Sequence, residues 1–303
     1  MSVPAYIHAL PDMVFLSEQE TIIPSGITFK DQTLHIDRPE SSLIHIVLWE
    51  LSGAQTLKIS LSPYTSVKAR LFVYYRKATN LVLDYQLGAQ SSGEIFQSFI
   101  ANRPCAFSLT HQGSLAEKAK LTLDSLLFFR GTSSLKENFD LIGVDASLMA
   151  RTLQVAYQND RTDRTLSVRH QAKRTFSDIT NHVIATERAK VKYQVIGEIK
   201  KGMKGSSCSQ INRGLLMGGV SEIESDPMLL IDEYDVSANH GASIGQINEE
   251  ELFYLSSRGL SIDVATRLIV SSYLQPFLDV LQTKPLIHAI SRLFNHRIQG
   301  GTS

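Results

Sequence analysis

The chain has 303 residues, and 43% of them are hydrophobic, which is enough to build one large domain or two around a sizeable core. Thirty basic and thirty acidic residues give zero formal charge, which argues against a broad attraction to nucleic acid or to an anionic membrane. The two cysteines, Cys105 and Cys208, are far apart and form no CxxC or Cys/His group, so we expect a reducing compartment.

The N-terminal residues, MSVPAYIHALPDMVFL, lack a basic region followed by a long apolar run. No other window offers the ~18 uncharged apolar residues of a membrane span. We therefore expect a cytoplasmic protein. Pro4, Pro11 and Pro24 discourage a long helix, so residues 1–30 are predicted to form an arm or a first edge strand.

From about Gln32 to Ile247 the sequence consists of short runs in which apolar and polar residues alternate, a period typical of strands. The breaks between the runs contain Gly, Asn or Asp. One helix is predicted in this part, Ser92–Asn102, with Glu94 in its first turn and Pro104 beyond its end. The clearest predicted strands lie at residues 57–61, 71–75, 81–83, 121–123, 153–155, 166–168 and 191–195.

Many short strands could form a sandwich, a barrel or a solenoid. Two similar units, AKLTLDSLLFFRG near residue 119 and ASLMARTLQVAYQ near residue 146, recur at about the length of one β-solenoid coil. Few Asn-Gly or Asp-Gly hairpin signals separate the strands, which counts mildly against a hairpin-rich sandwich. A parallel β-solenoid is therefore compatible with the sequence, although the residues alone leave all three architectures open.

The last part of the chain, residues 248–303, is helical by pattern. Asn248 with Glu251 forms a capping-box pattern, and a second helix is predicted to start at Ser261. Pro276 is expected to bend or end that helix, and Pro285 fits the first turn of a third. Apolar residues recur at spacings of three and four in each predicted helix: Leu252 and Leu255 in the first, Ala265, Leu268 and Ile269 in the second, and Ile287, Ile290, Phe294 and Ile298 in the third. Gly259 and Gly300-Gly301 mark the ends of the first and third helices.

The stretch HGASIGQINEEELFYLSSRG, residues 240–259, resembles the signature of the SufB/SufD family, the scaffold proteins of the SUF iron–sulfur cluster assembly machinery. Gly241 after His240 favours the SufD branch, because a Glu usually follows that His in SufB. Looser upstream matches extend the resemblance over roughly residues 165–280: His170 with Thr175 and Ser177, Gly197-Glu198-Ile199, and Gln210, Asn212 and Arg213.

This resemblance implies a fold and a function. The fold is a right-handed parallel β-helix over residues 31–247 with a C-terminal helical domain over residues 248–303, whose helices we expect to cover one end of the coil stack. The function is that of a SufD-like scaffold subunit, not an enzyme, that pairs with a SufB-like subunit and docks a SufC-like ABC ATPase. Alone, such a subunit could form a homodimer. The ATPase contact is predicted at Glu249, Glu250, Tyr254 and Arg258.

His240 is the predicted metal ligand. A lone histidine in a loop is usually structural or merely exposed, but the resemblance implies that it binds an iron–sulfur cluster at the subunit interface together with a Cys of the partner. Some family members have Cys two residues before this His, whereas this chain has Ala238. We therefore expect no tightly bound cofactor in the isolated chain, but a transient cluster shared with the SufB-like subunit.

The pairing surface is predicted to lie in Leu215–Tyr234, directly before the signature. Its Met228-Leu229-Leu230-Ile231 run could form an edge strand that a second chain extends, or it could simply be buried.

Three alternatives remain open at this point. One is a SufB-like subunit that carries sulfur and cluster on its own cysteines; Cys208, near Lys200, Lys201 and Lys204, could be a sulfur acceptor but is more often a small buried residue. Another is a carbohydrate-active β-helix enzyme that uses Asp160 and Asp163, although QNDRTDR reads more simply as a charged turn. The third is a plain solenoid adaptor without a cluster role.

Overall fold

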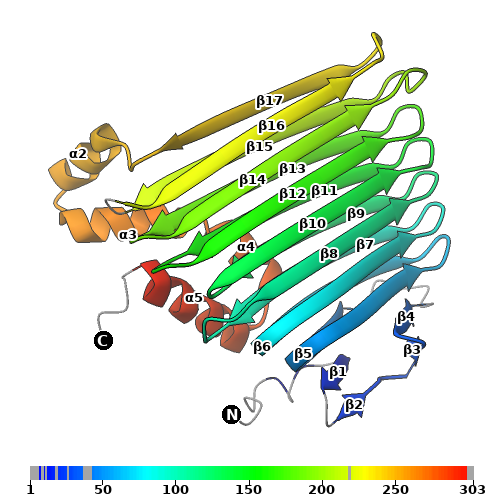
Figure 1. Ribbon diagram of the computed structural model, residues 1–303, viewed down its shortest axis with the longest axis horizontal. Coiled ribbons are helices and arrows are strands. Elements are labelled where there is room, and N and C mark those ends of the chain that lie inside the picture. The colour runs from blue at the N-terminus through cyan, green and yellow to red at the C-terminus, as the bar shows by residue number, and fades with distance from the viewer. Residues whose placement is uncertain are drawn as a thin grey trace.

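The protein is a stack of coils in which two parallel sheets face each other across a narrow interior (Figure 1). The computed structural model describes residue 7, residue 10 and residues 12–17, 20–25, 27–36, 43–217 and 220–298. Each strand from β6 to β15 pairs in parallel with the strand two places later in the chain, so one coil contains two strands. The predicted β-solenoid is therefore confirmed.

The two sheets are named here by strand number. The long strands β5 (Leu43–Leu61) and β6 (Ser66–Leu87) begin the stack and contribute to both. The odd sheet continues with β7 (Ser92–Ala101), β9 (Lys120–Phe128), β11 (Ser147–Ala156), β13 (Phe176–Thr186), β15 (Ser207–Met217) and β17 (Ser237–Gly245). The even sheet continues with β8 (Phe107–Leu115), β10 (Thr132–Leu141), β12 (Arg161–His170), β14 (Lys190–Ile199) and β16 (Glu222–Ile231).

The coils stack in register, so residues on the same line face the same way in successive coils. Ser147 of β11 lies opposite Lys120 of β9 and Phe176 of β13, which confirms that the two similar units near residues 119 and 146 are successive coils. All seven predicted strand segments lie in strands. The interior is filled by Leu, Ile, Val and aromatic side chains from both sheets, as expected when each coil buries its inward face on the next.

One turn recurs in the odd sheet, two residues before each of the strands β7, β9, β11, β13 and β15. At this turn the backbone has a positive φ, with values from 55° to 72°. A non-glycine residue rarely adopts this conformation, yet only the last of the turns uses glycine. The residues are Gln90, Lys118, Asp145, Arg174 and Gly205.

The predicted helix Ser92–Asn102 is wrong, because this segment forms strand β7. Ile95 and Phe99 point into the coil interior, while Phe96 on the opposite face contacts the C-terminal helices. A strand that is buried on both faces loses the alternation of apolar and polar residues. The apolar residues of β7 therefore recur at a spacing that is also typical of a helix.

A charged network lies among the apolar residues in the interior of the middle coils. Arg164 forms an ion pair with Glu137, and it donates to Asn181 Oδ1 at 2.9 Å and to Thr152 Oγ1 at 3.2 Å. His111 Nδ1 lies 3.4 Å from the same carboxylate. Although burial by itself raises the pKa of Glu137, the neighbouring Arg164 and His111 outweigh it and hold this pKa at about 2. Glu137 is therefore a buried carboxylate that stays charged.

The N-terminal strands close one end of the stack. β1 (Met13–Ser17) and β4 (Thr33–Ile36) both pair in parallel with β5, and β2 (Thr21–Ile22) and β3 (Ile27–Lys30) form antiparallel pairs with them. Of the two alternatives for residues 1–30, the described part matches the edge strand; Pro4 and Pro11 lie outside the described residues.

The C-terminal part contains four helices where three were predicted: α2 (Glu249–Ser257), α3 (Ile262–Ser272), α4 (Gln275–Leu281) and α5 (Lys284–Ile298). Asn248 and Ser261 cap α2 and α3 as predicted, while Pro276 lies in the first turn of the additional helix α4. Gly300-Gly301 lie outside the described residues. None of the described helices is long and apolar enough to cross a membrane.

These helices do not cover an end of the coil stack, contrary to the prediction. α4 and α5 pack on the outer face of the odd sheet, where Phe277, Ile290 and Phe294 meet outward-facing residues such as Phe128 and Leu153. The predicted inward face of α3 is partly wrong as well. Ala265 is buried, but Leu268 is 53% exposed. Outward apolar residues of the odd strands, such as Phe96, Phe128 and Leu153, provide the apolar surface that these helices bury.

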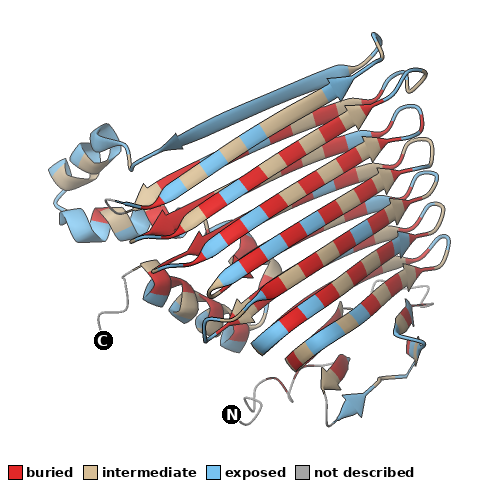
Figure 2. Ribbon diagram, viewed as in Figure 1, coloured by how far each residue is buried: buried red, intermediate tan, exposed pale blue. Residues whose placement is uncertain are grey.

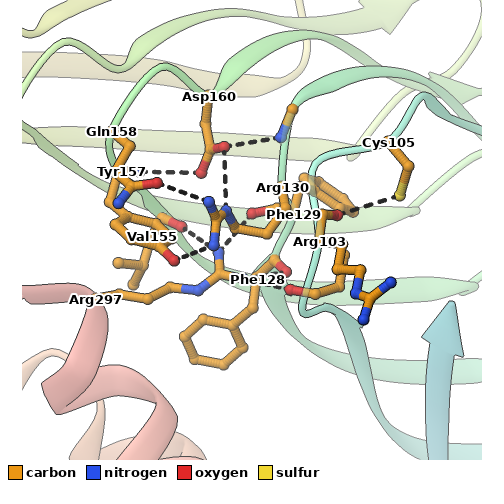
Figure 3. Close-up of polar contacts among 12 residues, drawn as sticks. Arg103, Cys105, Phe128, Phe129, Arg130, Val155, Tyr157, Gln158, Asp160 and Arg297 are labelled. Atoms are coloured by element: carbon orange, nitrogen blue, oxygen red, sulfur yellow. Dashed lines mark hydrogen bonds and ion pairs between the residues drawn. The ribbon is translucent and has the colours of Figure 1, made fainter. Parts of the chain in front are cut away.

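Buried arginines fix α4 and α5 to this face. Arg297 of α5 donates to four main-chain oxygens of neighbouring strand ends and turns, at 2.5–3.3 Å, and its guanidinium lies over the Tyr157 ring (Figure 3). Burial lowers the pKa of Arg297 to about 10. Arg70 of β6 donates to Val280 O of α4 at 2.7 Å. Neither residue is recognisable as an anchor from the sequence, because a lone arginine in an amphipathic pattern looks like a solvated residue.

Candidate functional site: the open last coil

The last coil, formed by β16 and β17, is the exposed end of the stack. Every residue of β17 is exposed, whereas strands in the middle of the stack alternate between buried and accessible residues (Figure 2). β17 pairs with β15 on one edge only, and no strand among the described residues pairs with its other edge. The stack therefore ends in a sheet edge with free main-chain hydrogen-bonding groups.

His240 lies in the middle of β17, on the line of residues that faces the interior. It pairs in register with Gln210 of β15, which pairs with Ile179 of β13, and both of those side chains are buried. Residues in register on neighbouring parallel strands point to the same face of the sheet. His240 is thus an inward-facing residue that has no further coil over it, and it is exposed for that reason.

The residues beneath His240 come from the looser sequence matches. Gly197 lies where an added Cβ would be 2.5 Å from Cys208 Sγ and 2.9 Å from Gln210 Nε2, so only glycine leaves room for both side chains. With its amide oriented to match donors and acceptors, Gln210 accepts from Gly197 N at 2.9 Å and donates to Val195 O at 3.3 Å. These motif residues therefore build the platform under the last coil.

Cys208 is a buried thiol with 1% exposure, in agreement with the simpler interpretation of this residue. Burial raises the pKa of the Cys208 thiol, and hydrogen bonds with Ser177 and Gln210 offset part of that rise. Burial is the main cause of this shift, and no lysine is among its causes; Lys200 instead lies 3.6 Å from Glu198. Cys208 thus lacks the thiolate character that a sulfur acceptor needs.

His170 has a structural role inside the stack. Its Nδ1 lies 2.8 Å from Thr175 Oγ1 and its Nε2 2.9 Å from Ser177 Oγ, and burial lowers the pKa of His170 to about 4. His182 lies edge-on to Tyr273, the residue that follows α3, and burial together with the charge of Arg213 lowers the pKa of His182 to about 4. The His…Thr-x-Ser match is therefore an internal hydrogen-bonded group.

The predicted pairing run, Met228–Ile231, lies at the end of β16, the outermost strand of the even sheet. Leu230 is 49% and Ile231 is 36% exposed, while Met228 and Leu229 are half-buried. The alternative that this run is simply buried does not hold. Gly218 and Gly219, within the predicted surface Leu215–Tyr234, lie outside the described residues.

The predicted ATPase contact lies on α2, which has no buried residue. Glu249, Glu250, Tyr254 and Arg258 are all exposed, and the Arg258 guanidinium lies 5.4 Å from the Tyr254 ring centroid. Sequence reasoning missed Phe253, which is 76% exposed. Its position in the helical pattern gave no signal, because exposure of an aromatic residue depends on what packs against the helix.

Asp160 and Asp163 do not form a paired acidic site. Asp160 is buried in a turn, where it accepts from Gly131 N at 2.8 Å and from Tyr157 N at 3.1 Å, beside Arg130 (Figure 3). Asp163 is an exposed residue within strand β12, so the charged turn predicted for QNDRTDR extends only as far as residue 160. No group of three or more His, Cys, Asp or Glu side chains suited to a metal is present within the described ranges.

Comparison with known proteins agrees with this architecture. A family model described as "SUF system FeS cluster assembly, SufBD core domain" matches residues 75–273. The chain belongs to the SufB/SufD family. The match begins well before residue 165, where the recognisable sequence motifs start, and it runs from the first coils through α3.

Relatives within the family include both of its branches. The chain is 30% identical to SufD of Bacillus subtilis over 146 residues, 26% identical to SufD of Escherichia coli over 189 residues, and 29% identical to SufB of Bacillus subtilis over 162 residues. These alignments cover 47%, 62% and 53% of this chain, and 33%, 44% and 34% of the relatives. All three relatives are described as iron–sulfur cluster assembly proteins.

Proposed function

We propose that this chain is a SufD-like scaffold subunit that pairs with a SufB-like subunit through its open last coil. The observation that carries the proposal is the asymmetry of the stack: β1–β4 close one end, while β17 is exposed along its whole length at the other. A partner that continues the coils would satisfy the free main-chain groups of β17 and cover Leu230 and Ile231.

In this arrangement His240 lies at the seam and supplies one ligand to a nascent iron–sulfur cluster, which is the cargo of the complex. Neutral imidazole is a suitable iron ligand, and the exposed position of His240 makes it reachable from the partner. The remaining ligands come from the SufB-like subunit, so that the cluster site is complete only in the assembled pair.

A SufC-like ABC ATPase docks on α2 and α3 in this proposal. Phe253, Tyr254 and Ile262 present apolar surface there, flanked by Glu249, Glu250 and Arg258. Only residues 246–248 separate the end of β17 from the start of α2. A nucleotide-dependent movement of the ATPase would therefore act on the strand that carries His240.

Copurification tests the proposal. The chain, coexpressed with the SufB-like and SufC-like proteins of the same organism, is expected to elute with both as one complex. Tyr254→Ala with Phe253→Ser should release the ATPase but keep the SufB-like subunit. A solitary monomer that cleaves acidic polysaccharide would instead support the carbohydrate-active alternative and end this proposal.

The role of His240 has its own test. His240→Ala is expected to leave both partners bound and to lower the yield of reconstituted cluster in the complex at least several-fold, measured by iron and sulfide content and by absorbance. Asn239→Ala, on the opposite face of the same strand, is the matched control and should leave the yield unchanged. Equal yields for His240→Ala and wild type would remove His240 from the site.

A further inference from the structure

One half of β16 carries a row of carboxylates on its outer face. Glu222, Glu224 and Asp226 alternate along the strand and are all exposed. Each is bonded on its inner side to β14: Lys190 Nζ is 2.5 Å from Glu222, Lys192 Nζ is 2.8 Å from Glu224, and Gln194 Nε2 donates to Asp226 at 2.7 Å.

The bonds to β14 leave the other side of these carboxylates free. The side chains of Glu222 and Glu224 are 64% and 65% exposed, and each carboxylate can accept more hydrogen bonds than its single lysine provides. Along the register line that ends at Glu224, the sign of the charge alternates from strand to strand, from Asp163 to Lys192 to Glu224. A further strand added to this edge would continue the alternation with a cation.

The main chain of β16 also restricts which strands can pair with its free edge. Glu222 N and Asp232 N donate to Ala189 O and Ile199 O of the β14 side, so the N–H groups of the odd-numbered residues point to the free edge. Pro227 is odd-numbered, and it removes one donor from the middle of that edge. Proline and charge on an edge strand both hinder pairing with an arbitrary chain.

The chain around this edge is acidic throughout. Between Arg213 and His240 the sequence contains six carboxylates and no Lys, Arg or His. A second copy brought against the same edge would place carboxylates opposite or diagonal to carboxylates, which destabilises a cross-strand pair. The six residues are Glu222, Glu224, Asp226, Asp232, Glu233 and Asp235.

We propose that the acidic half of β16 selects a partner edge strand with alternating Lys or Arg residues, and that it disfavours self-pairing of this chain through the same edge. This inference rests on the proposed pairing at the last coil and names the chemistry of the partner. The apolar run Met228–Ile231 supplies contact area, and the acidic row decides which chain and which register are accepted.

The test uses the full-length chain and the SufB-like subunit of the same organism, with affinities measured by titration at 50 and 500 mM salt. The variant Glu222→Gln/Glu224→Gln/Asp226→Asn should bind the subunit about tenfold more weakly at low salt, and its affinity should lose most of the salt dependence. Sedimentation velocity at low salt should show a larger dimer fraction for the variant than for the wild type. Circular dichroism confirms the fold of each protein.

A matched control removes three surface carboxylates from strands that have a neighbour on both sides, in Asp84→Asn/Glu94→Gln/Asp140→Asn. Each of these has a basic partner on a neighbouring strand, as Glu222 does, but none is on the free edge. This control variant should bind the SufB-like subunit with the affinity of the wild type. If the edge variant binds like the wild type at both salt concentrations, or if it dimerises no more than the wild type at low salt, the selection by the acidic row is overturned while the pairing stands. If the wild type does not bind the SufB-like subunit at all, the proposed function fails instead.

Discussion

The middle coils and the last coil have the same backbone geometry but different physical roles. Ile179, Gln210 and His240 occupy one register line on successive odd strands; the first two are 1% exposed and the third is exposed. The difference arises only from the presence or absence of a further coil. What the next coil covers contributes to stability, and what remains uncovered is available to a partner. Substitutions in the middle coils should therefore cost stability, while substitutions in the last coil should cost assembly.

The largest expected effect is in the middle coils, at the buried ion pair. Arg164→Met leaves the Glu137 carboxylate buried beside His111 alone and should lower the free energy of unfolding by about 3–5 kcal/mol. Urea unfolding monitored by circular dichroism measures this. The double variant Glu137→Leu/Arg164→Met should recover most of the loss, because it removes both charges. A single variant within about 1 kcal/mol of the wild type would contradict the assigned role of the pair.

The next effect is a pH dependence that arises from the buried His170 in the middle coils. The pKa of His170 is about 4 in the folded chain, against about 6.5 in the unfolded chain, so the unfolded chain takes up its proton first as the pH falls. Stability should therefore decrease from pH 6.5 toward pH 4, by about 2 kcal/mol between pH 8 and pH 5 from His170. Urea midpoints over this range give the slope, and His170→Gln should reduce it. An unchanged slope would mean that His170 is protonated in the folded chain.

The smallest effect on stability is expected in the last coil. His240→Ala should change the free energy of unfolding by less than about 0.5 kcal/mol, because the side chain is exposed. Gln210→Ala, one strand earlier on the same line, should cost about 1–2 kcal/mol, because it removes hydrogen bonds to the main chain of β14. Thermal melts of the two variants make the comparison directly. Equal losses would show that the last coil is covered in solution by another part of the molecule or by a second copy.

Much of the architecture follows from the residues alone. The alternating runs predicted strands, the two units near residues 119 and 146 predicted successive coils, and the capping residues Asn248 and Ser261 predicted two helix starts. The number of coils could not be predicted from the sequence. The turn that recurs in each coil has a backbone conformation that glycine usually marks, but here it is formed by Gln90, Lys118, Asp145 and Arg174. Strand β7 could not be predicted either, because a strand that is buried on both faces lacks the alternation of apolar and polar residues.

The sequence by itself determined the local structure, the family resemblance and the identity of the residues around the last coil, since these depend on neighbours along the chain. Only the tertiary structure decided which of these residues are covered. The C-terminal helices pack on the outer face of the odd sheet, with Arg297 and Arg70 as anchors, and so they leave β16 and β17 uncovered. The exposure of His240 depends on where segments distant in the chain come to lie, and no local pattern encodes that.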